Sequence, residues 1–411
     1  SLKGNLGHLI TASGVAGLIK ILLAFENKTI PGTPNSAPNL PAVAGNGFEV
    51  PTANSEWKSD GARLAAISSF GFGGNNAHLL VSEESSTLEA GIEPKTETEI
   101  EKFAIVNLAV RTSDDPNADA FGRRICGAGA NVFDGNDKIS LAAKSLAFPP
   151  NDLKEALGQQ LLLIELLPQL QASIESTDSE RMGIFIGMQT DSEVCRAGLR
   201  WRLQDLDPGG DEVDLNAEIA PIVNAASVIG RMPNVPANRI SNQLDITGPG
   251  FTVSREELSG DAALDLAMTA IKRGELDAAV GGAVEVTDKQ IDVVALQKVS
   301  PSMQPEDSHA AVMMVIKTES QARKDGDQIL ALIEAAQIDA AQEQSDTTSS
   351  VHPETNITAH AAEGLLNLAA GVQRMRAGQM TGVDSGTGIL RGTALIQNRS
   401  IFGESTSWLL H

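Results

Sequence analysis

Short apolar runs alternate with longer helical patterns from residue 102 onward. The runs KFAIVNLAV (102–110) and RMGIFIGM (181–188) are continuously apolar, as is typical of strands buried on both faces. Between them, residues 153–174 carry apolar side chains at helical spacing and predict an amphipathic helix. Strand-like and helix-like stretches continue to alternate through 238–286 and 309–336. This alternation predicts α/β layers rather than an all-α or all-β fold.

The first 84 residues carry a separate pattern. Residues 9–25, LITASGVAGLIKILLAF, predict a helix rich in small residues, and the polar residues within it argue against a membrane span. A Pro, Asn and Gly-rich stretch at 31–51 predicts a surface loop. Residues 62–84, ARLAAISSFGFGGNNAHLLVSEE, predict a strand, a glycine loop and a second strand.

A polar, acidic stretch separates these two patterns. Residues 85–101 contain almost no large apolar side chain, which predicts a linker between a domain at 1–84 and a second at 102–411. The two domains also resemble each other, since GHLITASGVAGLIK (7–20) is echoed by AHAAEGLLNLAAGV (359–372). Two copies of one domain type, the second degenerate, explain this repeat.

Composition narrows the classes of function. The formal net charge is −22 and aromatic residues make up 3%, so phosphate attraction and base stacking are both disfavoured and we expect no nucleic-acid partner. Cys126 and Cys195 form neither a disulfide framework nor a zinc motif, so we expect a cytoplasmic protein without a metal site. No signal peptide is evident.

Two motifs in the first domain contain groups that could take part in catalysis. In KGNLGH, Lys3 precedes His8, a pair that can stabilise a developing oxyanion or enolate. In SSFGFGGNNAH (68–78), glycines permit backbone N–H groups to face a bound oxygen. Taken singly, each motif is better explained structurally: His8 as a structural histidine and the glycine loop as a plain turn.

Taken together, in this order and spacing, the motifs resemble the carboxy-terminal end of a β-ketoacyl synthase. The resemblance implies a thiolase-like α/β fold with mixed five-stranded sheets between helices. It implies that His8, supported by Lys3, helps to decarboxylate a malonyl extender and to stabilise the carbanion. It also implies that Phe72 gates the acyl pocket within a loop that includes Gly73, Gly74 and Asn75.

The second domain resembles the same family with its reactive centre altered. GPGFTV (248–253) resembles the approach to the ketosynthase nucleophile, which in the family is a cysteine at the turn into a helix. Here Glu257, preceded by Glu256, occupies that position. His360 is expected in the place of His8, and Trp408 in the place of His78. This pattern resembles the chain-length factors of polyunsaturated fatty acid and polyketide synthases, the non-condensing partners of ketosynthases.

The resemblance also implies substrates and partners. No cofactor is expected on the chain itself, since substrates would be carried on the phosphopantetheine of an acyl carrier protein. A ketosynthase domain is the expected pseudo-dimer partner within a homodimeric synthase. An acidic carrier would need a local basic patch on this acidic chain, for which Arg200, Arg202, Arg231 and Arg239 are candidates. Two alternatives stay open: Glu257 supports decarboxylation for priming, or the second domain is a structural scaffold.

Overall fold

The computed structural model divides the chain into two compact units, residues 1–98 and 99–411. It describes residues 1–36, 47–72, 74–84, 102–127, 139–142, 145–199, 202, 222–287, 294, 298, 308–335, 360–377, 394–399 and 405–411. The predicted linker at 85–101 lies outside the described residues, so the proposed domain limits of 1–84 and 102–411 remain predictions.

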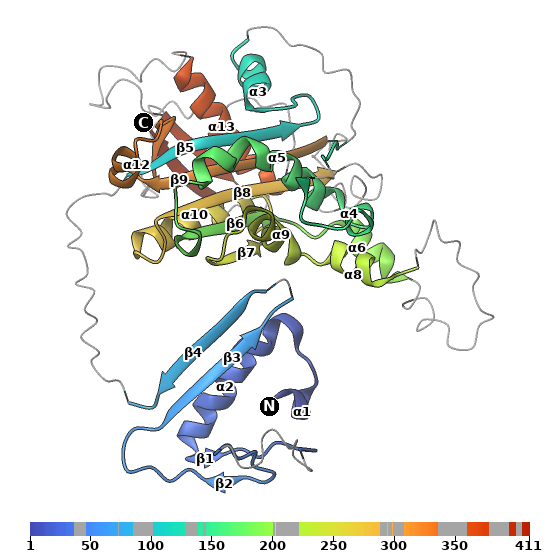
Figure 1. Cartoon of the computed structure of the whole chain (residues 1–411), viewed down its shortest axis with the longest axis vertical. Helices are drawn as coiled ribbons and strands as arrows, with labels where there is room; N and C mark the ends of the chain where they lie inside the picture. The colour runs from blue at the N-terminus through green and yellow to red at the C-terminus, as the bar shows by residue number, and fades with distance from the viewer. Residues whose placement is uncertain are drawn as a thin grey trace. The chain divides into compact units, whose positions relative to one another are not determined.

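Unit one is a helix packed on a β-hairpin (Figure 1). Its elements are α1 (Lys3–Leu6), the 3-10 helix η1 (Ile10–Ala12), α2 (Ser13–Glu26), β1 (Thr29–Ile30), β2 (Ser55–Glu56), β3 (Leu64–Phe70) and β4 (Asn76–Ser82). Strands β3 and β4 are antiparallel neighbours, joined by residues 71–75. The predicted order of helix, strand, glycine loop and strand is therefore confirmed.

Unit two contains the larger set of elements. Its helices are α3 (Ala118–Ile125), α4 (Pro150–Lys154), α5 (Gly158–Ile174), the 3-10 helix η3 (Ser179–Arg181), α6 (Ser192–Ala197), α8 (Ala225–Arg231), α9 (Val235–Leu244), α10 (Ser259–Lys272), α12 (Glu319–Asp325) and α13 (His360–Arg376). Its strands are β5 (Phe103–Thr112), β6 (Met182–Met188), β7 (Gly250–Val253), β8 (Ala278–Thr287), β9 (Ser308–Thr318), β10 (Ala331–Ala335), β11 (Ala394–Arg399) and β12 (Ser405–Leu410).

The strands of unit two form one eight-stranded mixed sheet. Its order is β11-β12-β10-β5-β9-β8-β6-β7, with β6 parallel to both β7 and β8 and every other pair antiparallel. The neighbours β5, β9, β8, β6 and β7 make the expected five-stranded arrangement. The other three strands join the same sheet instead of forming a separate five-stranded one in the described residues, because β5 hydrogen-bonds to β9 along one edge and to β10 along the other.

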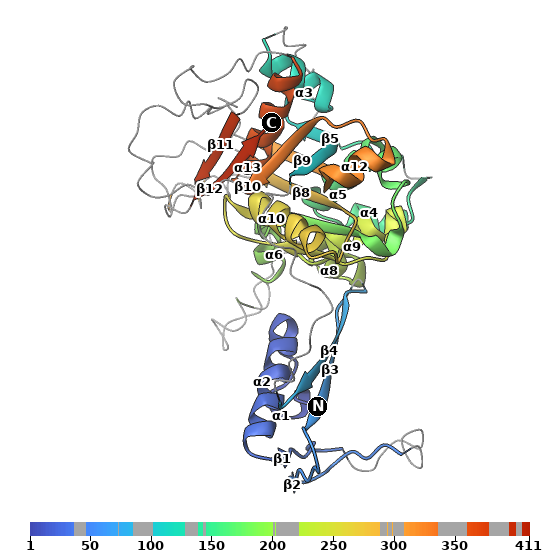
Figure 2. The ribbon, with the colours of Figure 1, turned by 90° about the vertical axis from the view of Figure 1, so that its left-hand side faces the viewer.

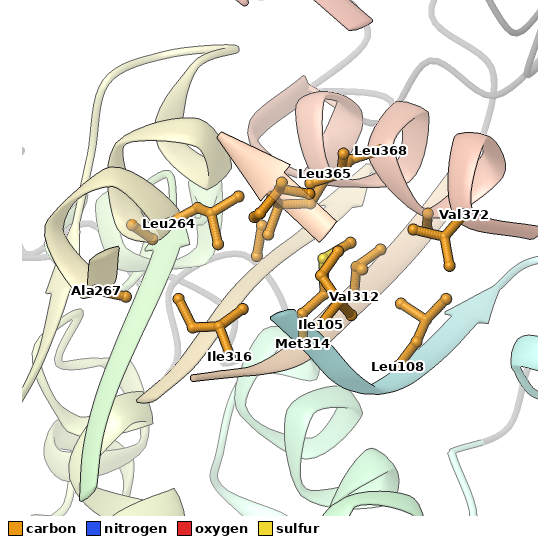
Figure 3. Packing of buried hydrophobic residues seen from close by; sticks show 14 of the residues in the cluster. Ile105, Leu108, Leu264, Ala267, Val312, Met314, Ile316, Leu365, Leu368 and Val372 are labelled. Atoms are coloured by element: carbon orange, nitrogen blue, oxygen red, sulfur yellow. The ribbon is translucent and has the colours of Figure 1, made fainter. Parts of the chain in front are cut away.

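Helices cover both faces of this sheet (Figures 1 and 2). Helices α5 and α9 pack on one face, where they share a core with alternate side chains of β5, β6, β8 and β9. Helices α10 and α13 pack on the other face, and side chains of the edge strands β11 and β12 contribute to the core there. Figure 3 shows Leu264 of α10 and Leu365 and Leu368 of α13 over Ile105 of β5 and Met314 of β9. Burial on both faces explains why these strands read as continuous apolar runs.

The helix predicted at 153–174 is split in two. α4 ends at Lys154 and α5 begins at Gly158 after Leu157, which has extended backbone. Apolar and even amide side chains of α5 are buried on more than one side, since α9 packs beside it as well as the sheet. The amphipathic pattern is therefore weaker in the structure than the sequence predicts.

Candidate functional site

The turn from β7 into α10 forms a tight elbow. Glu256 takes a left-handed conformation, with φ +48°, which is costly for a residue other than glycine. The Ser259 hydroxyl stabilises this turn, because it accepts a hydrogen bond from the Arg255 amide at 2.8 Å and donates one to the Glu256 carbonyl at 2.6 Å. The predicted strand, sharp turn and helix are confirmed, with Glu257 two residues before the first residue of α10.

The structure brings Glu257 and His360 together. Glu257 is 5% exposed and His360 is 4% exposed, and the Glu257 Oε1 atom lies 3.6 Å from His360 Nδ1. The Gln189 amide Nε2 lies 3.5 Å from the same imidazole nitrogen. Three segments distant in sequence, the end of β6, the elbow and the start of α13, thus meet at one buried polar site.

Burial controls the protonation of this site. It lowers the pKa of His360, while the nearby Glu257 and Glu256 raise it less strongly, so the imidazole favours its neutral form. Burial raises the pKa of Glu363, one turn along α13, and Glu257 and Asp261 raise it further. Neighbouring negative charges disfavour ionisation of Glu363, so it keeps its proton to a higher pH than an exposed acid would.

Asp261 is a site residue that sequence reasoning missed. It is fully buried in the first turn of α10, and its Oδ1 atom accepts hydrogen bonds from Trp408 Nε1 at 2.6 Å and Asn398 Nδ2 at 2.7 Å. Burial raises the pKa of Asp261, while the hydrogen bonds from Trp408 and Asn398 lower it. The sequence showed that Trp408 replaces a histidine of the first copy. Nothing along the chain linked Trp408 to an acid on α10.

Backbone angles align His360 with Ile10 of unit one rather than with His8. Ile10 in unit one and His360 in unit two both take positive φ, +50° and +34°, at the start of their helical segments. Four residues later come Gly14 and Gly364, each close to the matching hairpin. This pairing places Thr358 opposite His8, and Thr358 lies outside the described residues. A shared function for His360 and His8 therefore remains a prediction.

In unit one the predicted site residues are spread over the surface. Lys3 and His8 are both exposed, and His8 Nδ1 accepts a hydrogen bond from the Ile10 amide at 3.0 Å. Within the described residues no hydrogen bond or ion pair joins Lys3 to His8. The described part of unit one is one helix on one hairpin, which supplies no second layer to bury them.

The glycine loop of unit one is exposed as well. Phe72 is exposed, Gly74 has φ +97°, and the Asn75 carbonyl accepts from the Gly71 amide at 2.8 Å. Gly73 lies outside the described residues. The loop has the left-handed backbone that its glycines predicted, but its gating role stays a prediction.

Other kinds of site find little support among the described residues. They contain no group of three or more His, Cys, Asp or Glu side chains placed to hold a metal ion. No helix among them is both long and apolar enough to cross a membrane. A cavity of about 560 Å³ lies between α5 and the end of α9, on the face of the sheet away from α10, so it does not serve the Glu257 site.

Two family models match the chain. The model described as "Beta-ketoacyl synthase, C-terminal domain" matches residues 1–37, and "Beta-ketoacyl synthase, N-terminal domain" matches residues 143–313. The first match contains Lys3 and His8, and the second contains the elbow. The chain belongs to the β-ketoacyl synthase family. A carboxy-terminal match that precedes an amino-terminal match is the order expected where one ketosynthase domain ends and another begins.

Curated ketosynthase relatives are much longer proteins. One subunit of a polyunsaturated fatty acid synthase from Thraustochytrium sp. is 26% identical over 334 residues, 69% of this chain and 16% of that protein. One subunit of the phenolphthiocerol/phthiocerol polyketide synthase from Mycobacterium tuberculosis is 41% identical over 99 residues, 23% of this chain and 7% of that protein. This chain thus spans a small part of the length of these ketosynthase relatives.

Solved structures confirm the thiolase-like ketosynthase fold. The structure titled "PfaC Keto synthase-Chain length factor" matches with a TM-score of 0.70 and 20% identity, covering 100% of this chain and 53% of that one. The ishigamide ketosynthase/chain length factor matches with a TM-score of 0.52 and 14% identity, covering 75% of this chain and 99% of that one. At these identities the likeness establishes the fold alone.

Proposed function

We propose that this chain is part of the condensing region of a multidomain fatty acid or polyketide synthase, and that residues 102–411 act there as a non-condensing, chain-length-factor-like partner. The observation that carries the proposal is Glu257, buried against His360 at the elbow where ketosynthases place a cysteine. The proposal concerns the whole synthase, of which this chain supplies a part.

The chemistry explains why a carboxylate excludes condensation in unit two. In the condensation, a malonyl thioester loses CO₂ to give an enolate. Its carbon forms a bond to an acyl thioester carbonyl, and the C–S bond to the enzyme cysteine breaks. A carboxylate at that position would form an anhydride with the acyl group instead of a thioester. Glu257 therefore cannot hold the growing chain as cysteine does.

Unit one would contribute to the condensing member of the pair. In a complete ketosynthase, His8 would stabilise the enolate, Lys3 would add positive charge, and Phe72 would gate the acyl pocket with its loop. The nucleophile and the first catalytic histidine of that domain have no counterpart in residues 1–84. The condensing activity thus requires ketosynthase segments beyond unit one.

The edge of the sheet in unit two offers a surface for a ketosynthase partner. Strand β7 is the last strand of the sheet, and its Phe251 is 39% exposed. The Thr252 hydroxyl donates to the Pro233 carbonyl at 2.6 Å, which ties β7 to the segment after α8. Val228 and Ile229 of α8 are also exposed. An open strand edge beside exposed apolar side chains favours pairing with another domain.

An acyl carrier protein would deliver the substrates on phosphopantetheine. Of the basic candidates for its docking, Arg239 is buried and stacks over Phe148 with 5.0 Å from its guanidinium carbon to the ring centre, so it cannot form a surface patch. Arg231 donates to the Ser227 carbonyl at 3.2 Å, and Arg200 lies outside the described residues. Carrier docking and a cytoplasmic location remain part of the proposal.

A second candidate function is supported by the contact of Glu257 with His360. A carboxylate beside a neutral imidazole could assist loss of CO₂ from a malonyl thioester, for priming rather than extension. Deep burial of both side chains counts against it, because the substrate would have to reach them. No observation specifically favours the third alternative, a structural scaffold.

The first prediction separates these functions with the Glu257→Ala variant. We expect malonyl-thioester decarboxylation by the chain to be the same in the variant and the unchanged protein, as measured by CO₂ release. A general-base role would instead give a loss of about a hundredfold or more. Glu319→Ala, at the half-buried start of α12 where Glu319 pairs with Arg323, serves as the control.

Product length tests the partner role directly. In the full synthase, replacing residues 102–411 by the same region of a synthase with a different product should shift product chain length. Unchanged length with unchanged yield would favour the scaffold and reject the length-setting role.

A further inference from the structure

The elbow and helix α10 meet α13 at two levels. At the first level Glu257 of the elbow meets His360, and at the second Asp261 of α10 meets Gly364. On α13 the two contacted residues are four apart and so lie on one face of that helix. A Cβ atom at position 364 would overlap the Asp261 carboxylate, so the helices approach closely only because this residue is glycine.

The second level is tied to the hairpin β11–β12 by hydrogen bonds. The Asp261 carboxylate accepts from Trp408 of β12 and Asn398 of β11, and the Asn398 side-chain oxygen Oδ1 accepts from Asn367 Nδ2 of α13 at 3.1 Å. The network therefore joins α10, α13 and both hairpin strands. A buried acid is costly unless it is hydrogen-bonded, so losing one donor leaves Asp261 with less compensation for its burial.

The matching hairpin of unit one makes a different contact among the residues that the structure describes. There Ser68 lies opposite His78, and Ser68 Oγ and His78 Nδ1 are 2.9 Å apart across the two strands. In unit two the corresponding pair is Ile396 opposite Trp408, and isoleucine offers no hydrogen-bonding group. The indole of Trp408 donates to Asp261 of α10 instead.

We propose that Asp261 is a positioning residue that, through Trp408 and Asn398, pins α10 and α13 to the β11–β12 hairpin and holds the Glu257 elbow closed. The pin keeps the first level of the helix crossing buried by fixing the second. The pin itself does not depend on the proposed function, but its effect on product length rests on unit two shaping the acyl cavity without condensing.

The pin can be tested with a thiol probe at the elbow. In the full 411-residue chain, Glu257→Cys places a thiol at position 257 and Cys126→Ser removes one of the two native thiols, while the exposed Cys195 is kept as an unprotected reference. Alkylation by iodoacetamide is followed at both cysteines by peptide mass spectrometry. With the pin intact, we expect the thiol at position 257 to react at least about tenfold more slowly than Cys195, as a buried thiol should.

Variants of the pin provide the decisive comparison. Trp408→Phe keeps a ring but removes the donor, and Asp261→Leu removes the acceptor. Each should raise the alkylation rate at position 257 by at least about tenfold relative to Cys195. Leu162→Ala, in the core on the other face of the sheet, matches them as a destabilised control and should leave the ratio unchanged.

Four outcomes decide the proposal. A rise confined to the pin variants supports it. Equal rises in the pin variants and the Leu162→Ala control, or a thiol at position 257 that reacts as fast as Cys195 with the pin intact, overturn it. If alkylation rises in Trp408→Phe while the full synthase carrying that change keeps its product length, the pin stands and the length-setting role of unit two fails.

Discussion

Glu256 and Glu257 show how two adjacent acids can serve different ends at one turn. Glu256 supplies the left-handed backbone that reverses the chain, at a cost of roughly 1–3 kcal/mol for a residue other than glycine. Glu257 then lies buried near the start of α10, where a carboxylate also complements the positive end of the helix dipole. The dipole alone would explain an exposed acid. The contact with His360 is what makes the buried acid a functional candidate.

The close approach of α10 to α13 at Gly364 can be tested by substitution. The Gly364→Ala change should lower the free energy of unfolding of unit two by about 1–3 kcal/mol, since the added methyl overlaps the Asp261 carboxylate. Gly17→Ala in α2 is the matched control, because its Cβ would meet Ile67 at an ordinary 3.5 Å. The control should be neutral or stabilising by up to about 1 kcal/mol. Urea unfolding measures both, and equal losses would contradict the close approach at position 364.

Single elements of this chain were largely predictable where the apolar pattern was long or unbroken. Strands β5, β6 and β9 have continuous apolar runs because both of their faces are covered by helices. The elbow was predictable from its family-like sequence. The Asp261 network was not, since its partners are 137 and 147 residues away along the chain. A buried acid on a core helix has no local pattern that distinguishes it from an exposed one.

The elbow as an element depends on Ser259. The Ser259→Ala change removes two hydrogen bonds that close the turn, and we expect it to lower the free energy of unfolding by about 1–3 kcal/mol. Ser145→Ala, which removes one hydrogen bond from an exposed hydroxyl, should change it by less than about 0.5 kcal/mol. Hydrogen exchange at the Leu258 and Ser259 amides should quicken in the first variant. Unchanged exchange there would show that the turn holds its shape without the hydroxyl.

At the scale of the whole molecule, the sequence predicted layers but not how the strands would join. A strand's pattern records which of its faces are buried, whereas its neighbours depend on which edges meet, and β5 uses both of its edges. The site shows the same limit. The family resemblance predicted that Glu257 lies near His360. The structural alignment of His360 with Ile10 rests on backbone angles, which the sequence does not reveal.

The stability of unit two should depend on pH through its buried site. Burial lowers the pKa of His360 below its usual 6.5, so the unfolded chain takes up the proton first and the free energy of unfolding falls as the pH drops below about 6.5. His360→Gln should therefore lose less stability than the unchanged protein between about pH 7 and pH 5. Urea unfolding followed by circular dichroism at each pH measures the difference.

The Glu363→Gln variant should show the opposite pH dependence of stability. Burial and the neighbouring Glu257 and Asp261 raise the pKa of Glu363, so the folded protein is increasingly destabilised by this acid as the pH rises. Removal of that acid should make the variant gain stability relative to the unchanged protein with rising pH. Parallel pH profiles for both variants would contradict the assignment of the two groups.

The indole of Trp408 also has an optical consequence. The chain contains no tyrosine and three tryptophans, of which Trp57 lies in unit one, 5.2 Å from the ring of Phe25, and Trp408 lies buried in unit two. Light absorbed near 295 nm is therefore taken up by tryptophan alone. Replacing Trp57 and Trp201 with phenylalanine would leave fluorescence from Trp408 alone, beside the Asp261 carboxylate. That fluorescence would report on the folding of the degenerate copy.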